Sequence, residues 1–91
     1  MNNGTKLFLM TVRKHIQKAA GVIDAVNDQL TNIRECEQNA FHRMPDAIQM
    51  SEYGETAAIG VEKLIEACDE IRECLDKLDK ADTLMEEAMT L

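Results

Sequence analysis

The feature that most constrains the fold of this chain is a regular recurrence of apolar residues between Leu9 and Ala40. The spacing alternates between three and four residues, with one longer step that passes over Glu37. Such spacing places the side chains along one side of an α-helix and is typical of coiled coils and helix bundles. The members of this first seam are Leu9, Val12, Ile16, Ala19, Ile23, Val26, Leu30, Ile33 and Ala40.

Three further apolar residues widen this stripe. Phe8, Val22 and Cys36 each come one residue before a position of the first seam, counting the passed-over Glu37 as a position. A stripe of this width favours a bundle of three or four helices over a simple pair.

A second run of apolar residues with the same spacing follows in the other half of the chain. Its members are Ala57, Val61, Leu64, Cys68, Ile71, Leu75, Leu78, Asp82, Met85 and Met89. Asp82 interrupts this second seam, and a pairing charge is one explanation for it. A column of small residues lies beside the seam, and we expect it to face another helix backbone. The column consists of Gly60, Ala67, Cys74, Ala81 and Ala88.

The break between the two patterns contains Pro45, the only proline of the chain. Proline disfavours a helical conformation in the residue before it, so a helix should end near Arg43 or Met44. Ser51 is a suitable N-cap for the next helix. We therefore predict one domain over residues 1–91, with a helix at about 6–43, a corner at about 44–51 and a helix at about 52–90.

Charge and length then indicate how the helices associate. The first helix begins with basic residues and the second ends with acidic ones, so an antiparallel arrangement brings opposite charges together. Two helices alone have no further layer to cover their apolar sides, and 91 residues is close to the lower size limit for a stable domain. The predicted fold is all-α: a long antiparallel, coiled-coil-like helical hairpin that dimerises into a four-helix bundle.

Composition excludes several classes of function. The net charge of −7 argues against direct binding to nucleic acid or to an anionic membrane. No apolar run reaches the length of a membrane span. Cys36, Cys68 and Cys74 cannot all pair within one chain and show no zinc-binding spacing, so we expect reduced thiols that act as small core residues in a cytoplasmic protein.

Sequence motifs give no indication of an enzyme. Nucleophile, metalloprotease and nucleotide-binding signatures are missing. A di-iron bundle needs a glutamate three residues before each histidine, but Val12 precedes His15 and Asn39 precedes His42 at that distance. We therefore expect a non-enzymatic protein with no metal or cofactor.

An acidic strip on the predicted second helix is the leading candidate site. Its members lie opposite the second seam and repeat every three or four residues over about 21 Å. They are Glu62, Glu66, Asp69, Glu73 and Asp76. Like charges four residues apart cost helix stability, which favours a role beyond solubility, although a solvated face is the simpler explanation. Such a strip suits a basic protein partner, in the extreme case as a mimic of nucleic-acid phosphates.

The corner is a second candidate. Its larger apolar residues are Phe41, Met44, Ile48, Met50 and Tyr53. We expect them to plug the end of the bundle. The alternative is an exposed recognition tip that carries Arg43, Gln49 and Tyr53.

Two other hypotheses remain open. An oligomer of hairpins could sequester a small anionic signalling nucleotide through the cationic cluster near the N-terminus, with Arg34 and Arg43 in addition. That cluster consists of Lys6, Arg13, Lys14, His15 and Lys18. Alternatively, the chain is a structural coiled-coil adaptor with no dedicated site.

Three short motifs resemble a group of small acidic helical-hairpin proteins of phages and bacteria whose function is unknown. The motifs are ECEQNAF, MPDAIQ and SEYGE, within residues 35–66. They are similar to the group's EEQ-AF, MP-x-x-LQ and SE-x-GE pattern, although a cysteine replaces one acid here. The resemblance implies a phage or mobile-element origin and a helical hairpin. By analogy with small acidic proteins from such sources, we expect an inhibitor that occupies a basic, nucleic-acid-binding surface of a host defence protein such as a CRISPR effector.

Overall fold

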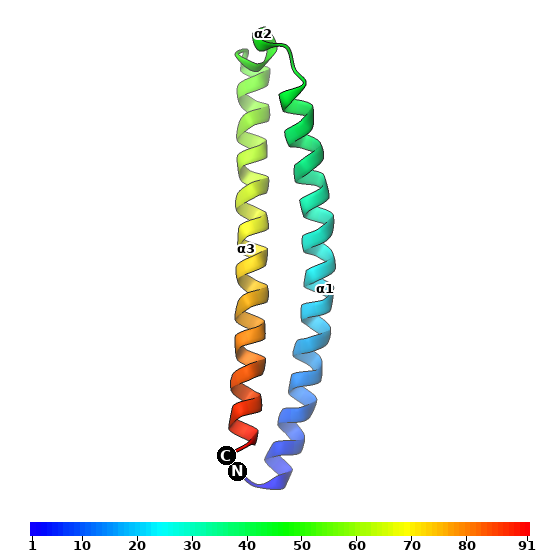
Figure 1. Cartoon of the computed structure of the whole chain (residues 1–91), viewed down its shortest axis with the longest axis vertical. Helices are drawn as coiled ribbons and strands as arrows, with labels where there is room; N and C mark the ends of the chain where they lie inside the picture. Colours follow the sequence, from blue (N-terminus) through cyan, green and yellow to red (C-terminus); the bar gives the residue numbers. More distant parts are fainter.

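The chain folds into two long antiparallel helices joined by a short helical corner (Figure 1). The computed structural model describes all 91 residues. Helix α1 spans Asn3–His42, α2 spans Asp46–Gln49 and α3 spans Glu52–Met89. There are no strands, and the molecule measures 68 × 16 × 14 Å. The predicted all-α helical hairpin is therefore confirmed.

The helix ends follow from their capping residues. Helix α1 begins earlier than predicted, because the Asn2 side chain accepts a hydrogen bond from the Thr5 N–H at 2.8 Å and caps the first turn. Its end at His42 agrees with the prediction from Pro45. Ser51 caps α3 as predicted, and its hydroxyl accepts from the Gly54 N–H at 3.3 Å.

The corner is held by backbone contacts that its sequence pattern does not reveal. The Gln49 side-chain amide donates to the carbonyl oxygens of Phe41 at 3.1 Å and Met44 at 3.0 Å, which ties α2 to the end of α1. Gly54 is buried against α2, where a Cβ would collide with the carbonyl oxygens of Ile48 and Gln49. Gln49 therefore clamps the corner, and its amide nitrogen is engaged within the chain.

The second seam lies between the helices as predicted. All ten of its members are buried or half-buried, and Cys68 is the only fully buried side chain. The prediction for the first seam is confirmed for only half of its members. Every second member, from Leu9 through Ile16 and Ile23 to Leu30, is half-buried toward α3, but the alternate members are exposed. These exposed members are Val12, Ala19, Val26, Ile33 and Ala40.

The residues that α1 places in the seam instead are one position further along the chain. They are Arg13, Ala20, Asn27 and Arg34, with Gln38 and Phe41 toward the corner. The centre of the apolar stripe of α1 therefore lies to one side of the contact with α3, and α3 covers only one edge of the stripe. Only Gly54 and Cys68 are buried in the whole chain. Neither long helix contains a segment long and apolar enough to cross a membrane.

Candidate functional site

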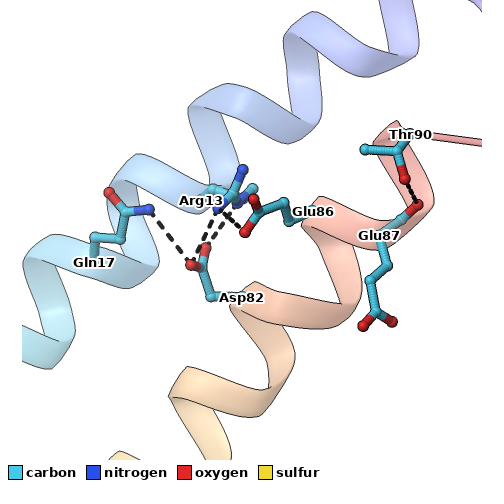
Figure 2. Close-up of polar contacts among 6 residues, drawn as sticks. All are labelled: Arg13, Gln17, Asp82, Glu86, Glu87 and Thr90. Carbon is cyan, nitrogen blue, oxygen red and sulfur yellow. Dashed lines mark hydrogen bonds and ion pairs between the residues drawn. The ribbon is translucent and has the colours of Figure 1, made fainter.

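A polar cluster near the open end of the hairpin fixes how α1 and α3 are aligned (Figure 2). Arg13 Nε donates to Asp82 Oδ1 at 2.9 Å, and its Nη2 donates to Asp82 Oδ2 at 3.3 Å and to Glu86 Oε2 at 3.2 Å. Gln17 Nε2 lies 3.5 Å from Asp82 Oδ2. Asp82 therefore interrupts the second seam because Arg13 pairs with it from α1.

This pairing shifts the ionisation of both partners. The hydrogen bond from Arg13 lowers the pKa of Asp82 below its ordinary value, against the opposing effect of desolvation. The same hydrogen bond raises the pKa of Arg13, so the ion pair is fully formed at neutral pH. The Arg13 and Asp82 side chains are 20% and 18% exposed, which identifies a structural ion pair inside the hairpin.

The acidic strip lies on the outer side of α3. All five of its residues are exposed, and none forms a hydrogen bond or ion pair with α1. Two of them contact cations of the same helix: Glu66 lies 3.5 Å from Lys63, and Asp69 lies 4.0 Å from Arg72. Exposed pairs of this kind contribute little, so the carboxylates remain free for another molecule.

The cationic cluster does not form a common site in one chain. Arg13 is turned inward to Asp82, whereas Lys14, His15 and Lys18 are exposed on other sides of α1. The one hollow on the molecule lies elsewhere and contains none of these bases. No group of three His, Cys, Asp or Glu side chains is arranged to hold a metal ion.

The corner divides into a packed part and an exposed part. Phe41 and Met44 are half-buried at the end of the hairpin, as a plug requires. Ile48, Met50 and Tyr53 are 43%, 81% and 70% exposed, so they do not plug the end of the single hairpin. Arg43 is exposed as well. Arg43 and Tyr53 thus remain available for recognition.

An extended apolar face is the main surface that the sequence pattern did not assign correctly. On α1 it comprises a protruding row, flanked by Phe8, Val22 and Cys36. The protruding row is Val12, Ala19, Val26, Ile33 and Ala40, all exposed. On α3 it comprises a recessed row of small residues. The recessed row is Gly60, Ala67, Cys74, Ala81 and Ala88.

Both rows lie on the same side of the hairpin. Gln17 and Glu86 each follow a seam residue by four positions, and they meet around the Arg13–Asp82 pair on one side. The members of both rows come one position before a seam residue, which is the opposite flank of each helix. In an antiparallel pair of helices, this flank of α1 and the same flank of α3 lie on one side of the hairpin. No charged residue occurs in either row.

The recessed row is only partly covered within this chain, where Ala67, Ala81 and Ala88 are half-buried. Gly60 and Cys74 are exposed, and a Cβ placed on Gly60 would meet no atom within 4 Å. Cys36 and Cys74 are exposed free thiols, so the expectation of core cysteines holds only for Cys68.

A hollow of about 280 Å³ opens beside this row. It is lined by Glu70, Glu73, Cys74, Lys77 and Leu78. Three of these residues are charged and two are apolar, and all five belong to α3.

Two polar atoms in the seam have no partner. Asn27 Oδ1 and Arg34 Nε are buried without a hydrogen bond, although Arg34 Nη2 lies 3.7 Å from Glu35. Their place in the seam was not predicted. Asp82 was the signal in the sequence that could have predicted it, because an acid in the seam of one helix requires a cation opposite it in the other helix. If Arg13 pairs with Asp82, the seam of α1 moves by one position and includes Asn27 and Arg34.

No protein-family model, no curated protein and no solved structure matches this chain.

Proposed function

We propose that the chain is a non-enzymatic interaction protein whose acidic strip occupies a basic surface on a partner protein. The observation that carries this proposal is the position of the strip. Five carboxylates face solvent along one side of a rigid helix, and their only ion-pair partners are cations of the same helix, at 3.5 and 4.0 Å.

The spacing of the strip indicates the kind of partner. Residues three or four apart on a helix have neighbouring side chains about 5–6 Å apart, so the strip presents a line of negative charge. A groove that binds nucleic-acid phosphates offers a complementary line of Lys and Arg. The partner class we propose is therefore a nucleic-acid-binding protein. With the resemblance to phage hairpin proteins, this extends to a host defence nuclease such as a CRISPR effector, which the chain would inhibit.

The exposed part of the corner can contribute to the same interaction. Arg43 and Tyr53 lie at the corner end of the hairpin, beyond the N-terminal end of the strip. Tyr53 comes nine residues before Glu62, on the opposite side of α3, so a partner on the strip would meet it only by reaching around the corner end of the hairpin. Tyrosine and arginine are enriched among residues that dominate binding energy, because they combine apolar area with polar groups.

The test compares two variants that lose the same charge. The strip variant carries Glu62→Gln, Glu66→Gln, Asp69→Asn, Glu73→Gln and Asp76→Asn. The control variant neutralises the four acids of α1 and one of α3, as Asp24→Asn, Asp28→Asn, Glu35→Gln, Glu37→Gln and Glu52→Gln. Each variant removes five carboxylates and changes the net charge from −7 to −2.

The immobilised proteins are exposed to a lysate of a bacterial host, and the retained proteins are identified by mass spectrometry. We expect the wild type and the control variant to retain the same nucleic-acid-binding protein, and the strip variant to lose it. Retention should disappear at about 0.5 M salt, where screening acts within a few ångströms. Equal retention by the strip variant, or failure of the wild type to retain a basic protein, would refute the proposal.

A further inference from the structure

The elongated hairpin exposes more surface than a compact chain of its mass, and the apolar face is part of that surface. The molecule exposes 6807 Å², whereas a compact monomer of 10.2 kDa exposes about 5,300 Å². The side of the hairpin that carries the apolar face extends about 40 Å from Val12 to Ala40 and is about 20 Å wide across two helices, or about 800 Å². This is the area that each partner contributes to a stable interface of standard size.

The shape of the apolar face is self-complementary, because it has a protruding row on α1 and a recessed row on α3. Valine and isoleucine side chains project from the protruding row on α1, while the recessed row on α3 carries only glycine, alanine and cysteine. A two-fold rotation therefore places the protruding row of each copy on the recessed row of the other. Two protruding rows placed against each other would hold the copies apart and leave both recessed rows empty.

We propose that a second copy of this chain covers the apolar face, giving a symmetric four-helix bundle. The two-fold axis runs along the length of the hairpin, so both corners lie at the same end. This arrangement brings α1 of each copy against α3 of the other. It leaves the acidic strips on the outside except at Glu73, which lines the hollow beside Cys74.

The Arg13–Asp82 contact predicts which residues meet between copies. Moving eight positions from Asp82 toward the corner gives Cys74, and moving nine positions from Arg13 in the same direction gives Val22. With the corners at one end, Val22 of one copy lies at the level of Cys74 of the other. The hollow beside Cys74 is then filled by the Val22 side chain of the second copy.

The first experiment measures mass in solution by light scattering and sedimentation for the wild type and two lysine variants. Ile33 lies in the protruding row and Ile59 lies outside the face, and they are similarly exposed, at 53% and 56%. Wild type and Ile59→Lys should have twice the 10.2 kDa chain mass at about 100 µM, where mass action favours association. In Ile33→Lys each interface gains unpaired charges, so its dissociation constant should rise at least about a hundredfold.

Circular dichroism at the same concentration establishes that each variant is helical. A monomeric wild type, or an Ile33→Lys variant as dimeric as Ile59→Lys, would overturn the proposal. So would equal loss of the dimer in both variants, because the effect would then not belong to this face.

The second experiment tests the arrangement by cross-linking. In a Cys36→Ala background, Val22→Cys treated with diamide should form a disulfide with Cys74 of the second copy, giving a covalent dimer on a non-reducing gel. Adding Cys74→Ala should abolish that dimer. A dimer that persists without Cys74 would show that the new thiol pairs with a different cysteine. The absence of a cross-link in either variant would exclude the contact between Val22 and Cys74. Both results would overturn this arrangement.

Discussion

Gly54 allows the chain to turn the corner, and replacing it with alanine should be the most damaging small change in the molecule. No glycine has a positive φ, so the backbone conformation at Gly54 is open to alanine. The obstacle is steric. A Cβ at this position would lie well within 3.0 Å of the carbonyl oxygens of Ile48 and Gln49, a distance that real Cβ atoms essentially never show.

The cost can be worked out from the contacts that must change. Alanine forces α2 away from the first turn of α3, and overpacking of this kind costs about 1–3 kcal/mol. The shift also disturbs the cap in which Ser51 accepts from the Gly54 N–H, a contact of the class that contributes about 1 kcal/mol. After the better helix propensity of alanine, about 1 kcal/mol, is subtracted, we expect Gly54→Ala to lower the free energy of unfolding by about 1–3 kcal/mol.

Thermal unfolding followed by circular dichroism measures this effect, with all proteins at one concentration. For a domain of this size the expected loss corresponds to a decrease in Tm of about 5–20 °C. Gly21→Ala is the matched control, because a Cβ at Gly21 meets no atom within 4 Å. The control should gain about 0.5–1 kcal/mol from helix propensity alone. If Gly54→Ala is as stable as Gly21→Ala, the steric reasoning about the corner is wrong.

Two further predictions concern the seam. The lowered pKa of Asp82 means that its ion pair with Arg13 contributes to stability above the ordinary carboxyl pKa and is lost as the pH falls through the lower, folded-state pKa. Urea unfolding between about pH 2 and pH 7 should therefore show a weaker acid dependence for Asp82→Asn than for the wild type; parallel pH profiles would contradict the assignment. Asn27→Leu removes a buried oxygen without a partner, so it should raise the free energy of unfolding by about 1–2 kcal/mol in the same assay, and a decrease would show that Asn27 is satisfied in solution.

The success of sequence reasoning differed between the two long helices for a physical reason. In α3 the spacing allows one apolar seam, and that seam lies against α1. In α1 two seams share Leu9, Ile16, Ile23 and Leu30 and differ only in the alternate positions. Hydrophobicity favoured the valine and isoleucine set, but Asp82 on α3 required Arg13 opposite it. Periodicity within one helix cannot choose between seams that the partner helix decides.

The corner and the candidate site show the same limit. Pro45 and Ser51 act within one or two turns, so their effects on the helix ends were predictable. The Gln49 clamp and the closeness of Gly54 to α2 depend on how the corner closes, which no local rule specifies. The outward position of the acidic strip followed from helical spacing. Its binding to a basic partner remains a prediction, because spacing alone describes the charge and not what meets it.

The slender shape of the hairpin has a consequence for how its assembly is observed. Its radius of gyration is 20.2 Å, against about 12 Å for a compact chain of this length. On a gel-filtration column such a rod elutes ahead of a globular protein of equal mass and can pass for an oligomer. Small-angle scattering separates the possibilities: side-by-side copies about 10 Å apart raise the radius only to about 21 Å, while copies joined end to end through their exposed corners approach twice the single-chain value. The long axis of the particle therefore reports which surface associates.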